Sequence, residues 1–395
     1  MTRGDKIIGD VESLIAGRTP QADGADRDLW AAQFDAGLAW VHFPNGRGGR
    51  GMPRSTQQLI DTRLAEAGFA SPSIHNQIGV GLVAGTLITH GTEEQIDRHL
   101  RPTFTTDEIW CQLFSEPGAG SDLANLSTSA RRNGDSWTVT GEKMWTSFAR
   151  SARWGLLLAR TDPQARKHAG ITCFIVDMHD PAVTVRPIRQ INGYSRVSEV
   201  HLDAVQLADT ARVGAVGEGW SVALTALSNE RVMLGAKTKV DRPEDRHIDT
   251  AVRAWRDHGR DPAIVDELTQ VWIRAELVRL TAVRAAEAQK AGTAGPEAAI
   301  GKLAAAELEQ DIFDLTMEAL GDEALLYPGY DDLEDAPYLE LEYADPRSAY
   351  LSSRRTTIAG GTSEIMRNVL GERVLGLPAE PRVDKDVPWI LTKRS

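Results

Sequence analysis

The sequence predicts an α+β fold in which helical segments at both ends enclose a β-rich middle. Apolar residues recur at helical spacing up to about residue 108. Short apolar or alternating runs, separated by Gly, Asn, Asp and Pro, occupy residues 109–214. The helical period returns from Gly219. Because helices and strands are segregated along the chain instead of alternating, the pattern argues against a parallel α/β sheet.

The N-terminal segment, residues 1–108, is predicted to be helical. Ile60 and Leu64 lie four residues apart, as they would on one face of a helix. Residues 92–95 read Thr-Glu-Glu-Gln, the pattern of a capping box. This box predicts a short helix that ends before Pro102.

The middle segment is predicted to be a β domain. Its strands are expected over residues 109–114, 136–140, 153–160, 171–177, 183–188 and 198–202. Both cysteines of the chain, Cys111 and Cys173, fall inside such apolar runs. Two isolated thiols in apolar surroundings indicate small core residues and neither a disulfide framework nor a metal cluster.

The remaining residues predict a second helical part with long helices. One helical run follows Pro262 and reaches about Gly292. Pro296 is a suitable first residue for the next helix, and Gly321 a suitable C-cap at its end. The last long helix is expected to begin near Thr362.

Composition limits the classes of partner that this 395-residue chain is expected to bind. A formal net charge of −12 argues against nucleic acid as the main partner, although a local basic patch could still bind an anionic ligand. No apolar stretch is long enough to span a bilayer, so we expect no membrane association and a cytoplasmic location. The acidic segment 331–345 fits no calcium loop and predicts a solvated surface loop. His75 and His90 lack a second ligand at metal spacing, so no metal site is predicted.

Three motifs stand out. In the first, residues 111–122, an apolar run breaks into a loop with glycines that let the backbone approach a ligand closely. The second, residues 141–147, reads Gly-Glu-Lys-Met-Trp-Thr-Ser, and the third, residues 358–365, reads Ile-Ala-Gly-Gly-Thr-Ser-Glu-Ile. Each has an ordinary explanation when taken alone: a tight turn, a core tryptophan, and a helix capped by Thr362 with Glu364 near its positive end.

In this order and spacing, the three motifs resemble those of the acyl-CoA dehydrogenase family of flavoenzymes, and the resemblance covers nearly the whole chain. It implies an N-terminal α-helical domain over residues 1–108, a β-barrel domain over 109–214 and a C-terminal four-helix bundle over 215–395. It also implies FAD as the cofactor and the α,β-dehydrogenation of an acyl-CoA thioester to the trans-2-enoyl thioester. An electron-transferring flavoprotein would then accept the electrons.

The resemblance assigns binding roles to matching positions of this chain. Residues that would contact FAD are Gln112, Phe114, Ser115, Ser121, Trp145, Ser147, Thr362 and Glu364. Residues that would contact the substrate are Ser121, Arg231 and Gly361, the last through its backbone near the thioester carbonyl. Small residues and backbone N–H groups suit a flavin ring, because donors near its N1, O2 and N5 positions stabilise the reduced form.

The catalytic base is expected on a helix. Many family members carry a glutamate two residues before the Thr of the third motif, but this chain has Gly360 there, and glycine cannot accept a proton. Glu230 is the candidate replacement, because it shares a helix face with apolar Ala223 and Leu227, where burial would favour a base that works near neutral pH. The run from Leu227 to Arg231 resembles isovaleryl-CoA-type members, which place their base on this helix before an arginine.

Two further departures leave alternatives open. The chain lacks the Arg-x-Gln-Phe-Gly segment that many members carry after the helix of Glu230, and it lacks a Gly-Gly-x-Gly segment after residue 317. In the family, both segments contact the adenine side of FAD. The expected assembly is a homo-oligomer or a heteromer with a paralogous subunit. The alternative functions are a flavin-poor structural subunit of a heteromeric dehydrogenase, and an oxygen-using oxidase or monooxygenase on the same fold.

Overall fold

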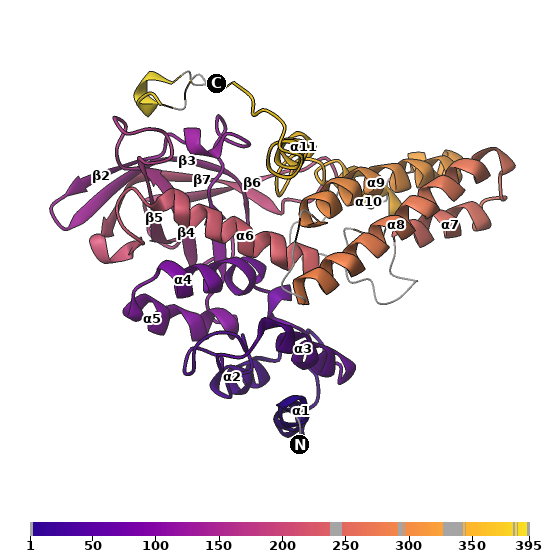
Figure 1. Cartoon of the computed structure of the whole chain (residues 1–395), viewed down its shortest axis with the longest axis horizontal. Helices are drawn as coiled ribbons and strands as arrows, with labels where there is room; N and C mark the ends of the chain where they lie inside the picture. Colours follow the sequence, from indigo (N-terminus) through magenta and orange to yellow (C-terminus); the bar gives the residue numbers. More distant parts are fainter. Residues whose placement is uncertain are drawn as a thin grey trace. The chain divides into compact units, whose positions relative to one another are not determined.

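The computed structural model describes residues 3–237, 247–290, 295, 297–326, 343, 345–381, 384 and 386–392 (Figure 1). The chain forms two compact units. The first unit comprises Met1–Ile188, Val197–Glu230 and Val383–Ser395, and the second comprises Arg189–Arg196 and Arg231–Arg382. Helices before and after a central sheet confirm the predicted α+β class.

The N-terminal part of the first unit is helical. Its α-helices are α1 (Arg3–Ile15), α2 (Arg27–Asp35), α3 (Gln57–Glu66), α4 (Ala84–His90) and α5 (Glu93–Phe104), and its shorter helices are η1 (Arg54–Thr56), η2 (Pro72–Ile74) and η3 (Gly79–Val83). Apolar side chains of α1, α2 and α3, among them Ile7, Leu29 and Ile60, form one buried core. The helical spacing of Ile60 and Leu64 therefore marks the inner face of α3.

Helix α5 begins as predicted but ends later. The Thr92 hydroxyl accepts a hydrogen bond from the Gln95 backbone, and the Gln95 side chain accepts one from the Thr92 backbone, which confirms the capping box. The prediction that the helix ends before Pro102 is wrong, because α5 continues to Phe104. Proline lacks the N–H group for one intrahelical bond, and so close to the helix end the helix loses little by continuing.

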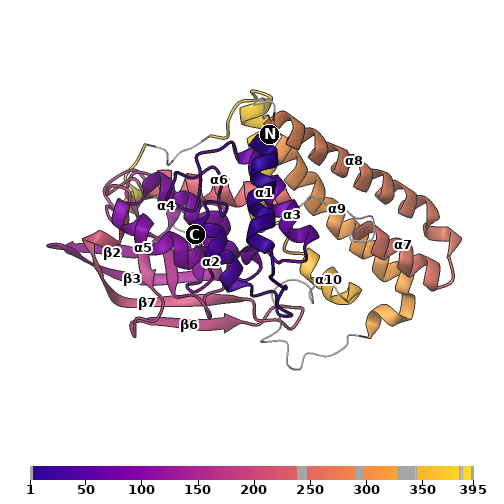
Figure 2. The same cartoon turned by 90° about the horizontal axis from the view of Figure 1, so that it is seen from below.

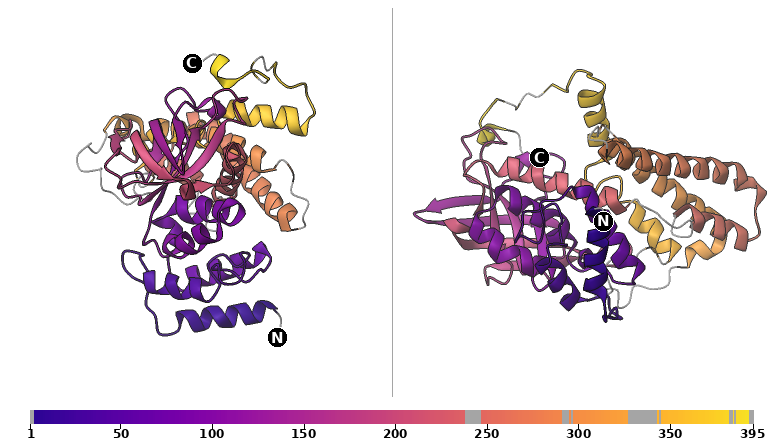
Figure 3. Two further views of the ribbon diagram at one scale, coloured as in Figure 1. Left: turned by 90° about the vertical axis from the view of Figure 1, so that its left-hand side faces the viewer. Right: turned by 60° about the horizontal axis from the view of Figure 1, so that its bottom comes forward.

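The middle of the chain forms an eight-stranded sheet. Its strands are β1 (Trp110–Leu113), β2 (Ser129–Asn133), β3 (Ser136–Ser147), β4 (Trp154–Arg160), β5 (Ile171–Asp177), β6 (Val183–Ile188), β7 (Val197–Ala208) and β8 (Arg212–Val213). The strand order is β6-β7-β3-β2-β4-β5-β8, and β1 pairs in parallel with β4. Figure 2 shows β2, β3, β7 and β6 side by side, and Figure 3 shows the strong curvature of the sheet.

The sequence pattern located most strands but missed β2 and β8. Strand β2 reads Ser-Ala-Arg-Arg-Asn and buries only Ala130, so it shows no apolar alternation. Strands β3 and β7 both extend beyond their predicted ranges, 136–140 and 198–202. The additional residues of β3 include polar Glu142 and Lys143, which hide the strand from a hydrophobicity criterion.

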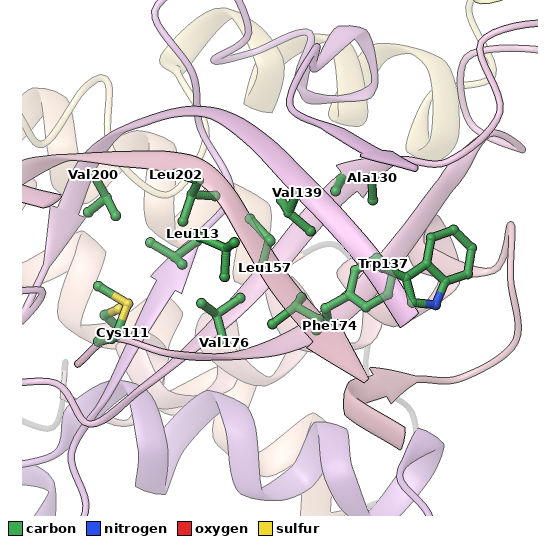
Figure 4. Packing of buried hydrophobic residues seen from close by; sticks show 14 of the residues in the cluster. Cys111, Leu113, Ala130, Trp137, Val139, Leu157, Phe174, Val176, Val200 and Leu202 are labelled. Atoms are coloured by element: carbon green, nitrogen blue, oxygen red, sulfur yellow. The ribbon is translucent and has the colours of Figure 1, made fainter. Parts of the chain in front are cut away.

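The core of the β domain lies inside the curved sheet. Figure 4 shows Leu113 and Val139 in the middle of this cluster, with Cys111 at one end and Trp137 beside Phe174 at the other. Cys111 and Cys173 are both fully buried, as predicted, and burial raises the pKa of each thiol far above its ordinary value. Both are therefore unreactive core residues.

Asn76 connects the N-terminal helices to β1. Its side-chain oxygen accepts hydrogen bonds from the backbones of Gly79 and Trp110, and its amide nitrogen donates to the carbonyls of Thr103 and Glu108. The residue is fully buried, so these four bonds replace its contacts with water. They fix the start of β1, the strand that leads into the first motif.

Helix α6 (Gly219–Lys237) begins in the first unit and continues into the second. Within the first unit it buries Val222, Ala223 and Ala226. The His90 ring nitrogen lies 2.8 Å from the Thr225 hydroxyl, which ties α6 to α4. Short helices η4 (Leu123–Asn125), η5 (Asp209–Ala211) and η10 (Trp389–Leu391) complete the first unit.

The regular elements described in the second unit are all helices, and its segment Arg189–Arg196 is an irregular loop. Beyond the end of α6 it contains α7 (His247–Asp257), α8 (Val265–Lys290), α9 (Glu297–Leu320), α10 (Pro346–Ser353) and α11 (Ser363–Val369), with η7 (Pro262–Ile264), η8 (Gly321–Leu325) and η9 (Leu370–Val374). The bounds of α8 and α9 match the predicted runs. Helix α11 begins where the last long helix was expected, but it has only seven residues, and α10 was not predicted. Of the acidic segment 331–345, only Tyr343 and Asp345 are described. No helix in the described ranges has the length and apolar character needed to cross a membrane.

Candidate active site

The first motif forms a tight turn at the end of β1. Phe114 is buried, and Ser115 is partly exposed. The backbones of Glu116 and Ala119 exchange hydrogen bonds of 3.1 and 3.0 Å, which closes the turn. Gly120 and Ser121 follow on the surface. The turn therefore offers backbone and hydroxyl groups to a ligand, while the residues at its start are buried inside the domain.

A buried ion pair holds this turn against β3. The Lys143 ammonium lies 2.8 Å from the Glu116 carboxylate and also donates to the carbonyl of Phe114 at 3.0 Å. Glu116 accepts three further hydrogen bonds from the Ser127 backbone, the Ser127 hydroxyl and the Thr128 backbone. The Lys143 and Glu116 side chains are 0% and 5% exposed, so the pair is excluded from water.

Burial acts on both partners, with different outcomes. Burial alone would raise the pKa of Glu116, but the Lys143 charge and the hydrogen bonds to the carboxylate outweigh it and hold the pKa at about 2. For Lys143, burial lowers the pKa, and the Glu116 charge opposes that shift. The carboxylate is therefore ionised throughout the neutral range, and its charge favours the ammonium form of Lys143.

A β-bulge turns Trp145 outward. In the pairing of β3 with β7, Lys143 lies opposite Val200 and Thr146 opposite Ser198, so Met144 and Trp145 together face one residue. Trp145 has a backbone φ of +61°, a left-handed value that is costly for a bulky side chain, and its side chain is 59% exposed. The possibility that Trp145 is core filler is therefore wrong.

The bulge and the turn are bonded to each other. The backbone of Met144 donates to the carbonyl of Ser115 at 2.9 Å. Partly exposed Gln112 and Ser147 lie on the same two segments, at the end of β1 and at the end of β3. The hydroxyl oxygen of Thr146 is buried, and none of the described residues supplies it with a hydrogen-bond partner. An exposed aromatic face, hydroxyl groups and an unsatisfied donor fit a planar heterocyclic cofactor such as a flavin.

The third motif forms the N-terminus of α11, in the second unit. Gly360 and Gly361 have backbone φ values of +68° and +98°, which only glycine adopts readily. The Thr362 hydroxyl accepts a hydrogen bond from the Ile365 backbone, so Thr362 is the N-cap as predicted. Glu364 is exposed; its own backbone N–H and the Thr362 side chain hold the pKa of its carboxyl below the ordinary value. Such a helix start binds electron-rich groups well.

Glu230 lies on α6 where the first unit ends. It is partly exposed, and so is Leu227, whereas Ala223 is fully buried. The next residue back, Asn229, donates to the carbonyl of Leu82 at 3.4 Å. Glu230 therefore borders the buried face of α6. The side chain of Arg231 lies outside the described part of the chain.

The two histidines considered as ligands make ordinary contacts. His90 bonds to Thr225, and the His75 ring packs against Trp30 at 5.9 Å between centroids. A different trio, Glu142, Glu199 and His201, brings three possible metal ligands within 4.8 Å of one another on the outer face of β3 and β7. All three are partly exposed, and no second observation in the described residues indicates an ion there.

Sequence reasoning missed the two residues that organise the turn, Glu116 and Lys143. A signal was present: Trp137 and Val139 alternate along β3, and the same parity places Lys143 inside the sheet. An inward lysine requires a buried acid, and Glu116 is the acid in the neighbouring motif.

Comparison with known proteins supports the class that this fold and site define, a flavin-dependent dehydrogenase. Residues 11–107 match the acyl-CoA dehydrogenase N-terminal domain, residues 111–205 the middle domain, and residues 217–375 the C-terminal domain. Acyl-CoA dehydrogenase IpdE1 of Mycobacterium tuberculosis is 34% identical over 360 residues, covering 90% of this chain and 89% of that protein. The chain belongs to the acyl-CoA dehydrogenase family, whose members are FAD-dependent flavoproteins.

Other relatives extend this picture. Acyl-CoA dehydrogenase FadE34 of Mycobacterium tuberculosis is 39% identical over 375 residues. The alignment covers 92% of this chain but only 49% of FadE34, so the chain spans about half the length of that relative. Among solved structures, the Tcur3481-Tcur3483 steroid ACAD has a TM-score of 0.73 at 25% identity, covering 95% of this chain and 97% of that one. The ChsE4-ChsE5 complex from Mycobacterium tuberculosis has a TM-score of 0.70 at 26% identity, covering 96% and 99%.

Proposed function

We propose that the chain is an FAD-dependent acyl-CoA dehydrogenase that converts an acyl-CoA thioester to the trans-2-enoyl thioester, with Glu230 as the base. The observation that carries the proposal is the exposed, strained Trp145 fixed beside the glycine-containing turn. Exposing a large aromatic side chain in a costly backbone conformation has no structural benefit by itself, so it indicates a ligand that covers the ring.

The cofactor supplies the acceptor for the hydride that leaves the substrate β-carbon. The chain's residues would do the rest. Trp145, Ser115 and Ser147 would hold the cofactor ring, and the backbone N–H of Gly361 would donate to the thioester carbonyl, where negative charge develops. Glu230 would take the α-proton. One C–H bond breaks at each carbon, the double bond forms between them, and the electron pair passes to an electron-transferring flavoprotein.

The assignment of Glu230 rests on elimination and position. Gly360 occupies the place where many family members have their glutamate. Glu230 lies at the edge of the buried face of α6, partly shielded from water and still accessible. A base must reach its substrate and must not be fully solvated, and this position satisfies both conditions.

For the substrate, we propose a bulky acyl-CoA, such as one with a ring system on its acyl chain. A solved structure described as a steroid ACAD matches 95% of this chain at 25% identity. A base carried by a helix also accords with branched or bulky acyl groups. Arg231 and Ser121 are the residues proposed to contact the substrate.

The second unit presents an apolar surface that suits an oligomer. The side chains of Trp272, Ile273, Leu277, Leu280 and Val283 on α8 are between 42% and 58% exposed. They recur at helical spacing, and a continuous apolar strip of this kind usually marks a protein interface. We propose that another subunit of the same fold covers it. The similarity to the ChsE4-ChsE5 complex makes a paralogous subunit the preferred partner, and a second copy of this chain is the alternative.

A second candidate function is a structural subunit that binds little flavin. The absence of both adenine-side segments from the sequence favours it. Part of the region where the first would lie, residues 238–246, is outside the described residues. The colour of the purified protein separates the two functions, because only a dehydrogenase subunit carries a flavin in its own site.

The test is a panel of acyl-CoA thioesters, linear, branched and ring-bearing, added anaerobically to the purified protein. Bleaching of the visible flavin band by at least one ring-bearing thioester is the expected result. A parallel oxygen-consumption assay identifies an oxidase, which would oxidise the thioester with oxygen as its only electron acceptor. A yellow protein that no thioester bleaches would refute the proposed function.

A further inference from the structure

The C-terminal end of the chain returns to the β domain and packs against the segment that follows the glycine-containing turn. We call the described residues Asp384 and 386–392 the C-terminal strap. Figure 1 shows this segment, in yellow, beside loops at one end of the sheet. Both the strap and the sheet belong to the first unit.

The buried anchor of the strap is Trp389. Its side chain is 5% exposed, and its indole N–H donates to the carbonyl of Asn125 at 3.3 Å. The guanidinium of Arg160 lies over the Trp389 ring, 4.6 Å from its centroid. The same guanidinium donates to the carbonyls of Ala124 and Leu126, at 2.6 and 3.2 Å. The Trp389 ring therefore covers Arg160, and the Arg160 guanidinium in turn bonds to the backbone of residues 124–126.

Hydrogen bonds fix the strap on either side of this anchor. The backbones of Trp389 and Ile390 donate to the carbonyls of Ala165 and Pro163, at 2.9 and 3.0 Å. The Thr392 hydroxyl donates to the Asn125 side chain at 3.3 Å. The strap therefore contacts Asn125 through two different residues.

A lysine connects the start of the strap to the turn. The Lys167 ammonium donates to both carboxylate oxygens of Asp122, at 3.1 Å each, and also to Asp384. The Lys167 side chain is 11% exposed, whereas those of Asp122 and Asp384 are 53% and 32% exposed, so the bridge is only partly shielded from solvent and salt. Asp122 immediately follows Ser121, a residue proposed to contact both FAD and the substrate.

We propose that the C-terminal strap is a positioning element for the cofactor site, because it holds residues 122–126 and through them the end of the turn that carries Ser121. This inference rests on the proposed function only in assigning FAD to the turn. With the strap docked, the turn keeps one conformation before the cofactor arrives. Without it, Arg160 loses its aromatic cover and Lys167 one of its two acids, so the turn must be ordered at the moment of binding, which weakens affinity.

The first experiment compares two single variants of the full chain. Trp389→Ala removes the buried anchor, and Leu391→Ala is the matched control because Leu391 is 73% exposed on the same strap. FAD affinity of the stripped protein is measured by fluorescence quenching, and hydrogen exchange of residues 116–126 by mass spectrometry. For Trp389→Ala we expect at least a tenfold weaker affinity, faster exchange of residues 116–126 and a changed shape of the bound-flavin absorption band. Leu391→Ala should match the wild type.

A second experiment protects the test against misfolding. The chain without residues 384–395 is mixed with a synthetic peptide of those residues. The peptide should restore slow exchange and FAD affinity, and the same peptide with Trp389→Ala should not. A lower melting temperature with unchanged FAD affinity and unchanged exchange of residues 116–126 would overturn the proposal, since it would leave the strap a purely structural role. All these readings are made without thioester, so a wild type that binds FAD but oxidises none refutes the proposed function alone.

Discussion

The ammonium of Lys143 and the carboxylate of Glu116 lie 2.8 Å apart inside the β domain, and together they connect β3 to the turn after β1. The pair determines where the backbone of the turn runs, because Lys143 also donates to the carbonyl of Phe114. The Met144 backbone, one residue further on, bonds to Ser115 and begins the bulge that exposes Trp145. A buried charge pair thus sets the geometry of the candidate cofactor site.

Removing one partner of this pair should be strongly destabilising. In Lys143→Met the Glu116 carboxylate is left buried without a counter-charge, and we expect the free energy of unfolding to fall by about 3 to 5 kcal/mol. The measurement is denaturant unfolding followed by circular dichroism. The double variant Glu116→Gln, Lys143→Met is the control and should recover part of the loss. A loss below about 1 kcal/mol in the single variant would contradict the buried pair.

Acid should weaken the fold through His99. Burial, helped by the Arg98 charge and opposed by Glu108, lowers the pKa of His99 to about 4, whereas a free histidine titrates near 6.5. Between these two pH values His99 is protonated in the unfolded chain but stays neutral in the folded chain. The contribution of neutral His99 to the free energy of unfolding is therefore fully present above pH 6.5 and declines as the pH falls toward 4.

The variant His99→Phe tests this origin. It keeps an aromatic ring against Trp110 and Trp154, both of which contact the His99 ring edge-on. Its free energy of unfolding should change less between pH 6.5 and 4.5 than that of the wild type. Equal slopes in the two proteins would show that His99 does not contribute.

Trp145 should lower the stability of the cofactor-free protein and raise its affinity for FAD. Trp145→Gly removes the penalty of the left-handed backbone, so the cofactor-free protein should gain about 1 kcal/mol in stability. The same change removes the aromatic face and should weaken FAD binding on the order of tenfold. Trp145→Ala is the control: it loses the aromatic face but keeps most of the backbone penalty. Calorimetry of the cofactor-free variants and FAD titration provide the two values, and unaltered FAD affinity in both variants would argue against a cofactor role.

The apolar strip on α8 should determine assembly. Leu277→Asp places a charge on a side chain that is 58% exposed, so a single subunit should fold normally while an assembled one should dissociate. Light scattering after size exclusion, with and without a co-expressed paralogous subunit, measures the mass. Lys302→Ala, on α9, is not expected to change it. An unchanged mass for Leu277→Asp would exclude this strip as the interface.

The sequence predicted the architecture well where a strong period or cap was present. Helix α8 follows Pro262, α9 ends at Leu320 before a left-handed Gly321, and Thr362 caps α11. It missed β2 because that strand buries a single side chain, and it missed α10, which follows the acidic segment.

The site was predicted as a set of residues but not as a geometry. The motifs identified the turn and Trp145, yet hydrophobicity favoured a buried tryptophan, because a bulge in β3 depends on its pairing with β7 and leaves no local signal. The contacts of Lys167 with Asp122 and Asp384 join positions far apart in the chain, which no local pattern reveals. Conversely, Gly360 alone predicted that either the base lies elsewhere or the chain is not a dehydrogenase.

The measurement that tests the central claim most directly is anaerobic flavin reduction in Glu230→Gln, with a thioester that bleaches the wild type. The variant keeps the size and polarity of the side chain and removes the proton acceptor. We predict that it binds FAD with wild-type affinity and that the visible band stays unbleached over the time in which the wild type is fully reduced. Bleaching at the wild-type rate would contradict the assignment of Glu230 as the base.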